Sequence, residues 1–158
     1  SKTYAMTGWR IGFTLAPEPI ISAITKLQSH SISNPTSIAQ KAAVEALLGS
    51  QDSVKQMLGE YRRRREFVLQ RLAKIPGVSC AEPQGAFYVY PNVSVAIGKN
   101  GIHNTLDFRD RLLKEAHVAA VPGEAFGTDK HIRISYATSM HELERGLDRI
   151  DQFIRSNS

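Results

Sequence analysis

Cysteine is nearly absent from this sequence, which has one, Cys80, among 158 residues. A single cysteine excludes a disulfide within the chain and a metal centre built from several thiolates. Such a protein needs no oxidising compartment, and we expect a cytoplasmic location. Cys80 itself is interpreted as a small packed side chain rather than as a nucleophile.

Long apolar runs are missing as well. No stretch approaches the roughly 20 apolar residues that a membrane-spanning helix needs. The first residues also lack the basic segment and apolar stretch of a secretory signal. We therefore expect no membrane partner. The abrupt opening on Ser1 and Lys2 indicates that the chain is a piece of a longer protein.

Common catalytic signatures are also absent. The sequence contains no G-x-S-x-G, no G-x-x-x-x-G-K-[ST] and no H-E-x-x-H, and its five histidines show no ligand spacing. These absences argue against a serine hydrolase, a P-loop NTPase and a zinc enzyme. We expect no metal.

What the sequence does contain is the composition of a folded protein, with 42% hydrophobic and 22% charged residues. Its net charge of +5 permits an acidic partner such as a phosphate, a carboxylate metabolite or a nucleic acid. The densest basic segment is the run Arg62 to Arg65. Four consecutive positions spread around most of a helix, so the run indicates a solvated face or a subunit contact, with a nucleic-acid patch as the alternative.

Helices and short strands are predicted along the whole chain. Five segments combine helical spacing of apolar residues with start or stop signals, namely the residues from Pro19, those from Ile38 to a left-handed Gly49, the stretch 52–75, the residues after Asn104 and those after the capping box at Ser139. Strands are predicted at 9–15, at two places within 78–91, at 117–123 and at 131–137. This pattern is that of an α/β protein.

The segment HIRISYA, at 131–137, alternates between apolar and polar residues. Ile132, Ile134 and Tyr136 share one face of the predicted strand, which leaves Arg133 on the other. Arg133 can therefore point into a cleft while its neighbours pack. The aromatic pair Phe87 and Tyr88 is expected to belong to the core of its strand.

The opening stretch SKTYAMTGWRIGF places a lysine and an arginine near one another, with small residues between them. A lysine amine serves catalysis when it attacks a carbonyl to form a Schiff base, and an arginine holds a phosphate by its planar fork. Lys2 and Arg10 can reach one ligand only if the chain turns back, which Thr7 and Gly8 would permit. The alternative is a frayed lysine and a strand-edge arginine.

This stretch resembles the pyridoxal-lysine segment of the class I, fold type I aminotransferases, in their aspartate and prephenate aminotransferase branch. There a Ser-Lys pair is followed by a small and aromatic stretch and by Gly-Trp-Arg-x-Gly. Five further segments resemble the same branch in the same order, namely SIAQKAAVEAL, YRRRREFVLQRL, PQGAFYVY, VAAVPGEAFG and HIRISYATS. Six ordered matches make the resemblance specific.

The resemblance implies the C-terminal part of a fold type I transferase. In that family a large domain with a seven-stranded, mostly parallel sheet carries the cofactor, and a long helix joins it to a small α/β domain. Residues 1–50 would then be the end of the large domain, and residues 51–158 the long linking helix with the small domain.

The resemblance also implies the roles of three residues. Lys2 would be the catalytic lysine that holds pyridoxal 5′-phosphate as a Schiff base, Arg10 a ligand of the cofactor phosphate, and Arg133 the residue that binds the substrate α-carboxylate. The expected reaction moves an amino group from an amino acid of the aspartate or glutamate type to a 2-oxo acid. The expected assembly of the longer protein is a homodimer.

Other functions remain open at this stage. The same fold can serve a pyridoxal-phosphate lyase or an amino-acid-sensing regulator, and the arginine run leaves a basic nucleic-acid module as a third alternative. No known nucleic-acid motif is present, so we expect no nucleic-acid partner. Because the family's other cofactor ligands lie in earlier segments, we expect the 158 residues alone to be inactive and to bind the cofactor poorly.

Overall fold

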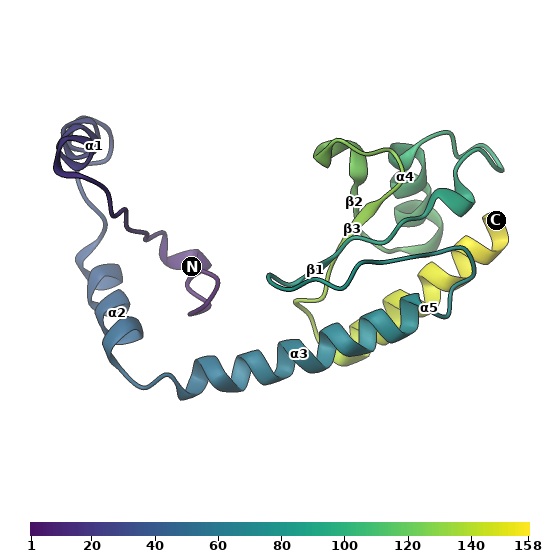
Figure 1. The fold of residues 1–158 in the computed structure, drawn as a ribbon, viewed down its shortest axis with the longest axis horizontal. Coiled ribbons are helices and arrows are strands. Elements are labelled where there is room, and N and C mark those ends of the chain that lie inside the picture. The colour runs from purple at the N-terminus through teal and green to yellow at the C-terminus, as the bar shows by residue number, and fades with distance from the viewer. The chain divides into compact units, whose positions relative to one another are not determined.

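The computed structural model describes all 158 residues and divides them into two compact units, Ser1–Leu58 and Gly59–Ser158. The boundary falls within the long helix α3, Asp52–Leu72 (Figure 1). None of the helices has both the length and the apolar character that crossing a membrane would require.

The first unit consists of helices and irregular chain. It contains the short 3-10 helix η1 at Thr7–Trp9, helix α1 at Glu18–Ser31, helix α2 at Ser37–Leu48 and the start of α3. Pro19 lies in the first turn of α1, where its missing N–H costs no hydrogen bond. Both predicted helices are confirmed.

Two local predictions for this unit are wrong. Residues 9–15 form no strand, because a strand needs a neighbour to accept its backbone hydrogen bonds and the unit contains none. Gly49 ends α2 with φ −78° and ψ −172°, which is extended rather than left-handed. Glycine is needed there for space, since a Cβ would clash with Glu45.

The second unit is built on a three-stranded antiparallel sheet with the order β1-β3-β2. The strands are β1 at Tyr88–Val89, β2 at Val121–Pro122 and β3 at Ile132–Ser135, and two 3-10 helices, η2 at Ser94–Ala96 and η3 at Gly123–Phe126, lie in the connections. Helices α4, Thr105–Ala116, and α5, Met140–Asn157, complete it.

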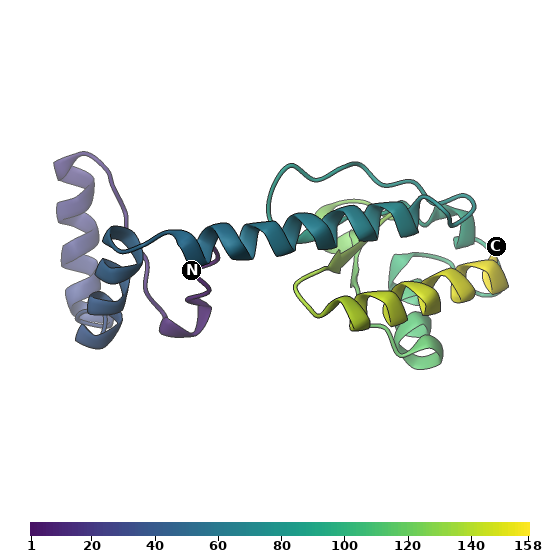
Figure 2. The same ribbon diagram turned by 90° about the horizontal axis from the view of Figure 1, so that it is seen from below.

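Helices α4 and α5 and the C-terminal half of α3 enclose the core with the sheet (Figure 2). Arg71 of α3 forms an ion pair with Asp148 of α5, and Arg155 of α5 donates to the carbonyl of Lys74 at 3.3 Å. Phe108 of α4 meets Phe153 of α5 edge to face, with ring centroids 5.3 Å apart. The core also includes Val68, Leu72, Ile102, Leu112, Ile132 and Ile150.

The predicted helix starts in this unit are confirmed, but only half of the capping box at Ser139 forms, because the Glu142 carboxylate accepts from Arg145 at 2.7 Å. The side chain of Asn104 accepts a hydrogen bond from the N–H of Asp107 at 2.8 Å, and the Ser139 hydroxyl accepts one from the N–H of Glu142 at 3.2 Å. Each bond satisfies an N–H that the helix itself leaves without a partner.

The strands are shorter than predicted. Of the two strands expected within 78–91, the second forms as β1 and the first is reduced to an isolated bridge between Ser79 and Asn92. The strand expected at 117–123 pairs only at Val121 and Pro122. The sequence therefore located these segments, but the backbone pairing that defines a strand depends on neighbours distant in sequence.

Candidate functional site

The N-terminal segment folds back on itself. The N–H of Met6 donates to the carbonyl of Ser1 at 2.8 Å, and the Ser1 hydroxyl contacts the carbonyl of Ile11 at 3.4 Å. The chain on either side of Lys2 is therefore brought beside the chain on either side of Arg10. This is the turn that the sequence required if both residues were to reach one ligand.

The residues that reverse the chain are not the ones that were predicted. Left-handed backbone occurs at Ala5, with φ 53°, and at Arg10, with φ 52°, whereas Thr7 and Gly8 belong to η1. Left-handed backbone is uncommon for residues other than glycine and is found where the surrounding structure imposes it. The two positions bracket the segment that reverses the chain.

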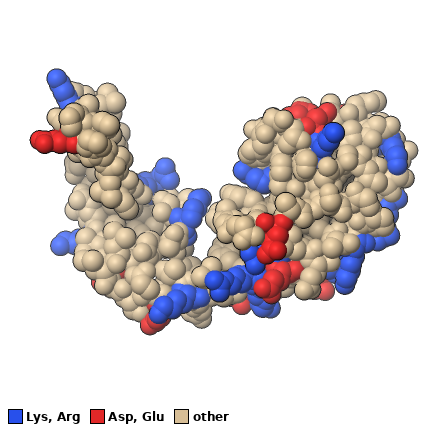
Figure 3. Space-filling view, in the orientation of Figure 1, with Lys and Arg blue, Asp and Glu red and all other residues tan.

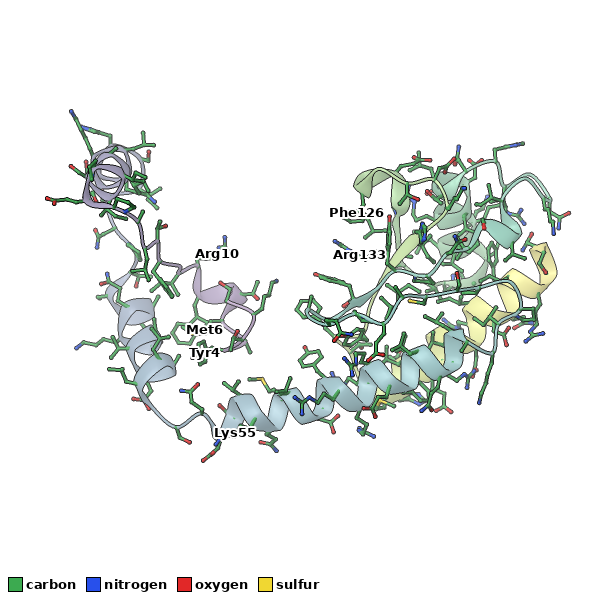
Figure 4. The ribbon with its side chains drawn as sticks, viewed as in Figure 1. Tyr4, Met6, Arg10, Lys55, Phe126 and Arg133 are labelled. Carbon is green, nitrogen blue, oxygen red and sulfur yellow. The ribbon has the colours of Figure 1, made fainter.

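Packing against α2 holds this loop from one side. Met6 is one of two buried hydrophobic residues in the unit, and the Tyr4 hydroxyl donates to the side-chain carbonyl of Gln51 at 3.3 Å. Gln51 in turn donates to the carbonyls of Ala46 and Gly49, each at 3.0 Å. Figure 4 shows Tyr4 and Met6 on the side of the loop that faces α2, with the Arg10 side chain directed elsewhere.

The guanidinium of Arg10 uses little of its hydrogen-bonding capacity. It donates one bond, from Nη1 to the carbonyl of Thr7 at 3.0 Å, and the side chain is exposed. A guanidinium has five N–H donors, so most of them point into solvent. Apart from Gly8 itself and its two neighbours in the chain, no residue has an atom within 4 Å of the place that a Cβ on Gly8 would take, so the loop is open on that side.

These features fit the pyridoxal phosphate that the resemblance implied. Lys2 supplies an exposed primary amine, and Arg10 supplies donors that the chain leaves open to an anion such as a phosphate.

No group of three or more histidine, cysteine or acidic side chains among the 158 residues could hold a metal ion.

Arg133 lies in the second unit, on the central strand of the sheet. Ile132, Ile134 and Tyr136 are buried as predicted, and Arg133 lies half-buried on the opposite face of β3. Its guanidinium carbon lies 4.4 Å from the ring centre of Tyr88 and 4.8 Å from that of Phe126. Figure 4 shows Arg133 and Phe126 near one another. No carboxylate of the 158 residues pairs with it.

The two rings next to Arg133 were not found from the sequence. Tyr88 was expected in the core of its strand, but it is half-buried and lies over the guanidinium. The alternation of β1 contains the missed signal, because Val89 is the residue of that strand that is buried. Phe126 carries no such signal, since it lies in η3, where side-chain alternation does not apply.

The arginine run is not a continuous free basic patch. Arg63 and Arg64 approach Glu60 at 3.0 and 3.7 Å, and Arg65 pairs with Glu82 at 3.3 Å. Arg65 also donates to the carbonyl of Pro83 at 3.2 Å. Basic and acidic side chains lie next to one another over this part of the surface (Figure 3). This arrangement favours the solvated face over the nucleic-acid patch.

Cys80 is half-buried, and desolvation raises the pKa of its thiol. A raised pKa lowers the fraction of thiolate, which is the reactive form. The structure thus supports the interpretation of Cys80 as a packed residue rather than a nucleophile.

Comparisons with known proteins agree with the resemblance. The family described as aminotransferase class I and II matches residues 1–150. An aspartate aminotransferase of Geobacillus stearothermophilus is 46% identical over 158 residues, which cover 100% of this chain and 40% of that protein. A probable aspartate/prephenate aminotransferase of Rickettsia typhi is 46% identical over 157 residues, covering 96% of this chain and 39% of that protein.

Solved structures show the same fold. An aspartate aminotransferase from Rhizobium meliloti matches with a TM-score of 0.94 at 44% identity, covering 99% of this chain and 40% of that one. An aromatic aminotransferase from Pyrococcus horikoshii matches with a TM-score of 0.89 at 39% identity, covering 99% of this chain and 41% of that one. The expected fold, part of a fold type I transferase, is confirmed.

The chain spans about 40% of the length of the curated relatives it matches. Within that span the match is nearly complete, in sequence and in structure. The chain therefore belongs to the class I and II aminotransferases, whose cofactor is pyridoxal 5′-phosphate.

Proposed function

We propose that the protein containing these residues is an aminotransferase that moves an amino group between an amino acid of the aspartate or glutamate type and a 2-oxo acid. The observation that carries the proposal is the N-terminal fold-back, which brings the segments of Lys2 and Arg10 together. The names of the relatives support the substrate class.

Three side chains have distinct roles in this proposal. Lys2 would hold the cofactor through its side-chain amine, and the same amine, when free, would take the α-proton of the substrate as a general base and then give it up as a general acid to an atom other than the α-carbon. Arg10 binds the cofactor phosphate through its open N–H donors. Arg133 binds the substrate α-carboxylate as a planar, two-bonded pair. When bound, the cofactor supplies an electron sink for the charge left by proton removal.

The same proposal includes a homodimer in the cytoplasm, with a role in amino-acid biosynthesis. It includes neither a nucleic-acid nor a membrane partner. The ion pairs of the arginine run and the absence of an apolar membrane-length helix are compatible with both of these exclusions.

The test uses the full-length protein and measures amino transfer from aspartate to 2-oxoglutarate. Lys2→Ala should abolish transfer and should prevent borohydride from fixing the cofactor to the chain, because no amine then remains at the reacting position. Lys55→Ala is the matched control: Lys55 is an exposed lysine of the same unit, paired with Asp52 at 3.2 Å, and its loss should leave activity unchanged.

Two results would overturn the proposal. A cofactor label found on a lysine other than Lys2 after borohydride reduction would remove its catalytic role. Cofactor binding without amino transfer to any 2-oxo acid would favour the lyase or the amino-acid sensor on the same fold.

A further inference from the structure

Two aromatic rings flank the guanidinium of Arg133, and they come from opposite sides of its strand. In the register of the sheet Tyr88 lies opposite Ser135, which shares a face with Arg133 two residues away. Val121 of β2 lies directly opposite Arg133 on the other side, and Phe126 follows in η3. The rings therefore reach the guanidinium from both neighbours of the central strand.

The position of Phe126 is imposed by the tight structure of η3. A Cβ on Gly123 would clash with the carbonyls of Thr128 and His131, so the chain there admits only glycine. The Tyr90 hydroxyl donates to the carbonyl of Gly123 at 3.3 Å. The Tyr90 ring also meets Phe126 edge to face, with centroids 5.9 Å apart. Tyr90 therefore contacts η3 at both Gly123 and Phe126.

Phe126 is unusual in its exposure. It is 48% exposed, and only two other large hydrophobic side chains of the second unit, Leu106 and Leu113, are exposed. A ring in this position contributes little to the core, but it covers a cation. Aromatic faces attract a guanidinium by their quadrupole, and the attraction grows as water is excluded.

We propose that Tyr88 and Phe126 are positioning residues that hold the Arg133 guanidinium and thereby set the affinity of the protein for carboxylates. Because the rings pack against the guanidinium group, its N–H edges are the donors left for a ligand, and these match a planar carboxylate. The inference rests on the proposed function for its substrate, although its physical content is carboxylate binding by Arg133.

A guanidinium that is already held in place before the carboxylate binds affects the binding of the carboxylate more than the rate of the chemical step. A free arginine side chain must lose rotamer freedom when it binds a carboxylate, whereas one already held between rings loses less. Loss of a ring should therefore raise KM and the dissociation constant of a carboxylate. It should leave kcat nearly unchanged, because the proton transfer assigned to Lys2 is not involved.

The test uses the full-length protein loaded with its cofactor and compares Tyr88→Leu and Phe126→Leu with Tyr88→Phe, which keeps the ring and removes only the hydroxyl. Each leucine variant should raise the KM for aspartate and the dissociation constant of succinate about fivefold, with kcat changed less than about twofold. Tyr88→Phe should match the parent. Thermal unfolding midpoints check that the variants are folded.

The decisive measurement repeats the ring replacements in an Arg133→Gln background. If the rings act through the guanidinium, their loss should have no further effect on succinate binding once the charge is gone. An equal loss in both backgrounds would overturn the proposal, because the rings would then act independently of Arg133. So would a wild-type protein that does not bind succinate, or a Tyr88→Phe variant as impaired as Tyr88→Leu.

Failure of the proposed function is separable from failure of this inference. A protein that transfers no amino group but binds succinate in a manner that depends on Arg133 and both rings would refute the aminotransferase role and support the positioning role. A protein that transfers amino groups with an unchanged KM after both rings are replaced by leucine would support the aminotransferase role and refute the positioning role.

Discussion

The two units bury their apolar side chains to very different extents. In Gly59–Ser158, seventeen hydrophobic residues form one buried core, and three large hydrophobic side chains are exposed. In Ser1–Leu58, only Met6 and Ala39 are buried, and twelve of the fifteen exposed large hydrophobic side chains of the chain lie there. Both units nevertheless contain helices with a clear apolar face.

The difference shows that a helical pattern and a core are separate properties. In α1 the apolar residues Ile20, Ile24 and Leu27 recur on one face, as in the helices of the second unit, yet all three remain exposed. Most of the stability of a helix in a protein comes from covering such a face rather than from intrinsic propensity. The first unit thus presents apolar faces with nothing within the unit to cover them.

The largest expected difference is in independent folding. Residues 52–158, which keep α3 whole, should unfold cooperatively in urea, because they contain the complete core. Residues 1–51 alone should show no cooperative transition by circular dichroism. A sharp transition in the short piece, or none in the long one, would contradict the comparison.

Truncating a core side chain of the second unit should destabilise the chain more than a matched truncation in the first unit. Phe108 is fully buried against Phe153, so Phe108→Ala should lower the free energy of unfolding of the 158-residue chain by about 3–5 kcal/mol. Leu27→Ala is the matched truncation in the first unit, where the side chain is 70% exposed, and should change it by less than about 0.5 kcal/mol. Urea unfolding measures both. Similar losses at the two positions would show that Leu27 is covered in solution.

Removing a helix cap should also cost more unfolding free energy in the second unit than in the first. Ser139→Ala removes the acceptor of a hydrogen bond from Glu142 and should cost about 1 kcal/mol of unfolding free energy. Thr36 occupies the same position before α2 but makes no capping bond with its side chain. Thr36→Ala should therefore be nearly neutral in the same denaturation experiment. A substantial loss at Thr36 would indicate a cap that forms only in solution.

The smallest expected effects are on how stability changes with pH. Asp52 in the first unit and Glu124 in the second should change it in opposite directions. Hydrogen bonds from Ser50 and Lys55 lower the pKa of Asp52, so its contribution to stability is present above its unfolded-state pKa and is lost as the pH falls through the folded-state value. Desolvation and the nearby Asp129 raise the pKa of Glu124. Its contribution is present below its unfolded-state pKa and is lost as the pH rises through the folded-state value.

Carboxyl-carbon NMR titration of the 158-residue chain measures both groups at once. The midpoint of Asp52 should lie below the ordinary value of an aspartate, and that of Glu124 above the ordinary value of a glutamate. Asp129→Asn should lower the Glu124 midpoint and leave that of Asp52 unchanged. Midpoints displaced in the same direction would disprove the assignment of causes.

The parts of the fold that depend on local sequence were predicted well. The starts of α4 and α5 follow from Asn104 and Ser139, whose side chains bond to N–H groups three residues away. The faces of β3 follow from strict alternation at Ile132 and Ile134. In each case the interacting groups are close in sequence, so the pattern contains the physical cause.

The parts that failed depend on distant partners. The stretch 9–15 has strand-like composition but no neighbouring strand in its unit, and the first strand expected within 78–91 is reduced to a bridge at Ser79. Gly49 was assigned to a left-handed cap, yet it is required because Glu45 leaves no room for a side chain. Hydrogen-bond partners and steric space are properties of the assembled chain.

The sequence by itself determined which side chains are available for chemistry, the lysine at position 2 and the arginines at positions 10 and 133, and on which face of its strand Arg133 lies. Only the tertiary structure decided that the chain around Lys2 folds back beside Arg10, and that Tyr88 and Phe126 flank Arg133. The physical reason is one of range. Periodicity reports on contacts within a turn or a strand, whereas a fold-back and a ring packed on a cation arise from segments that meet only after the chain has folded.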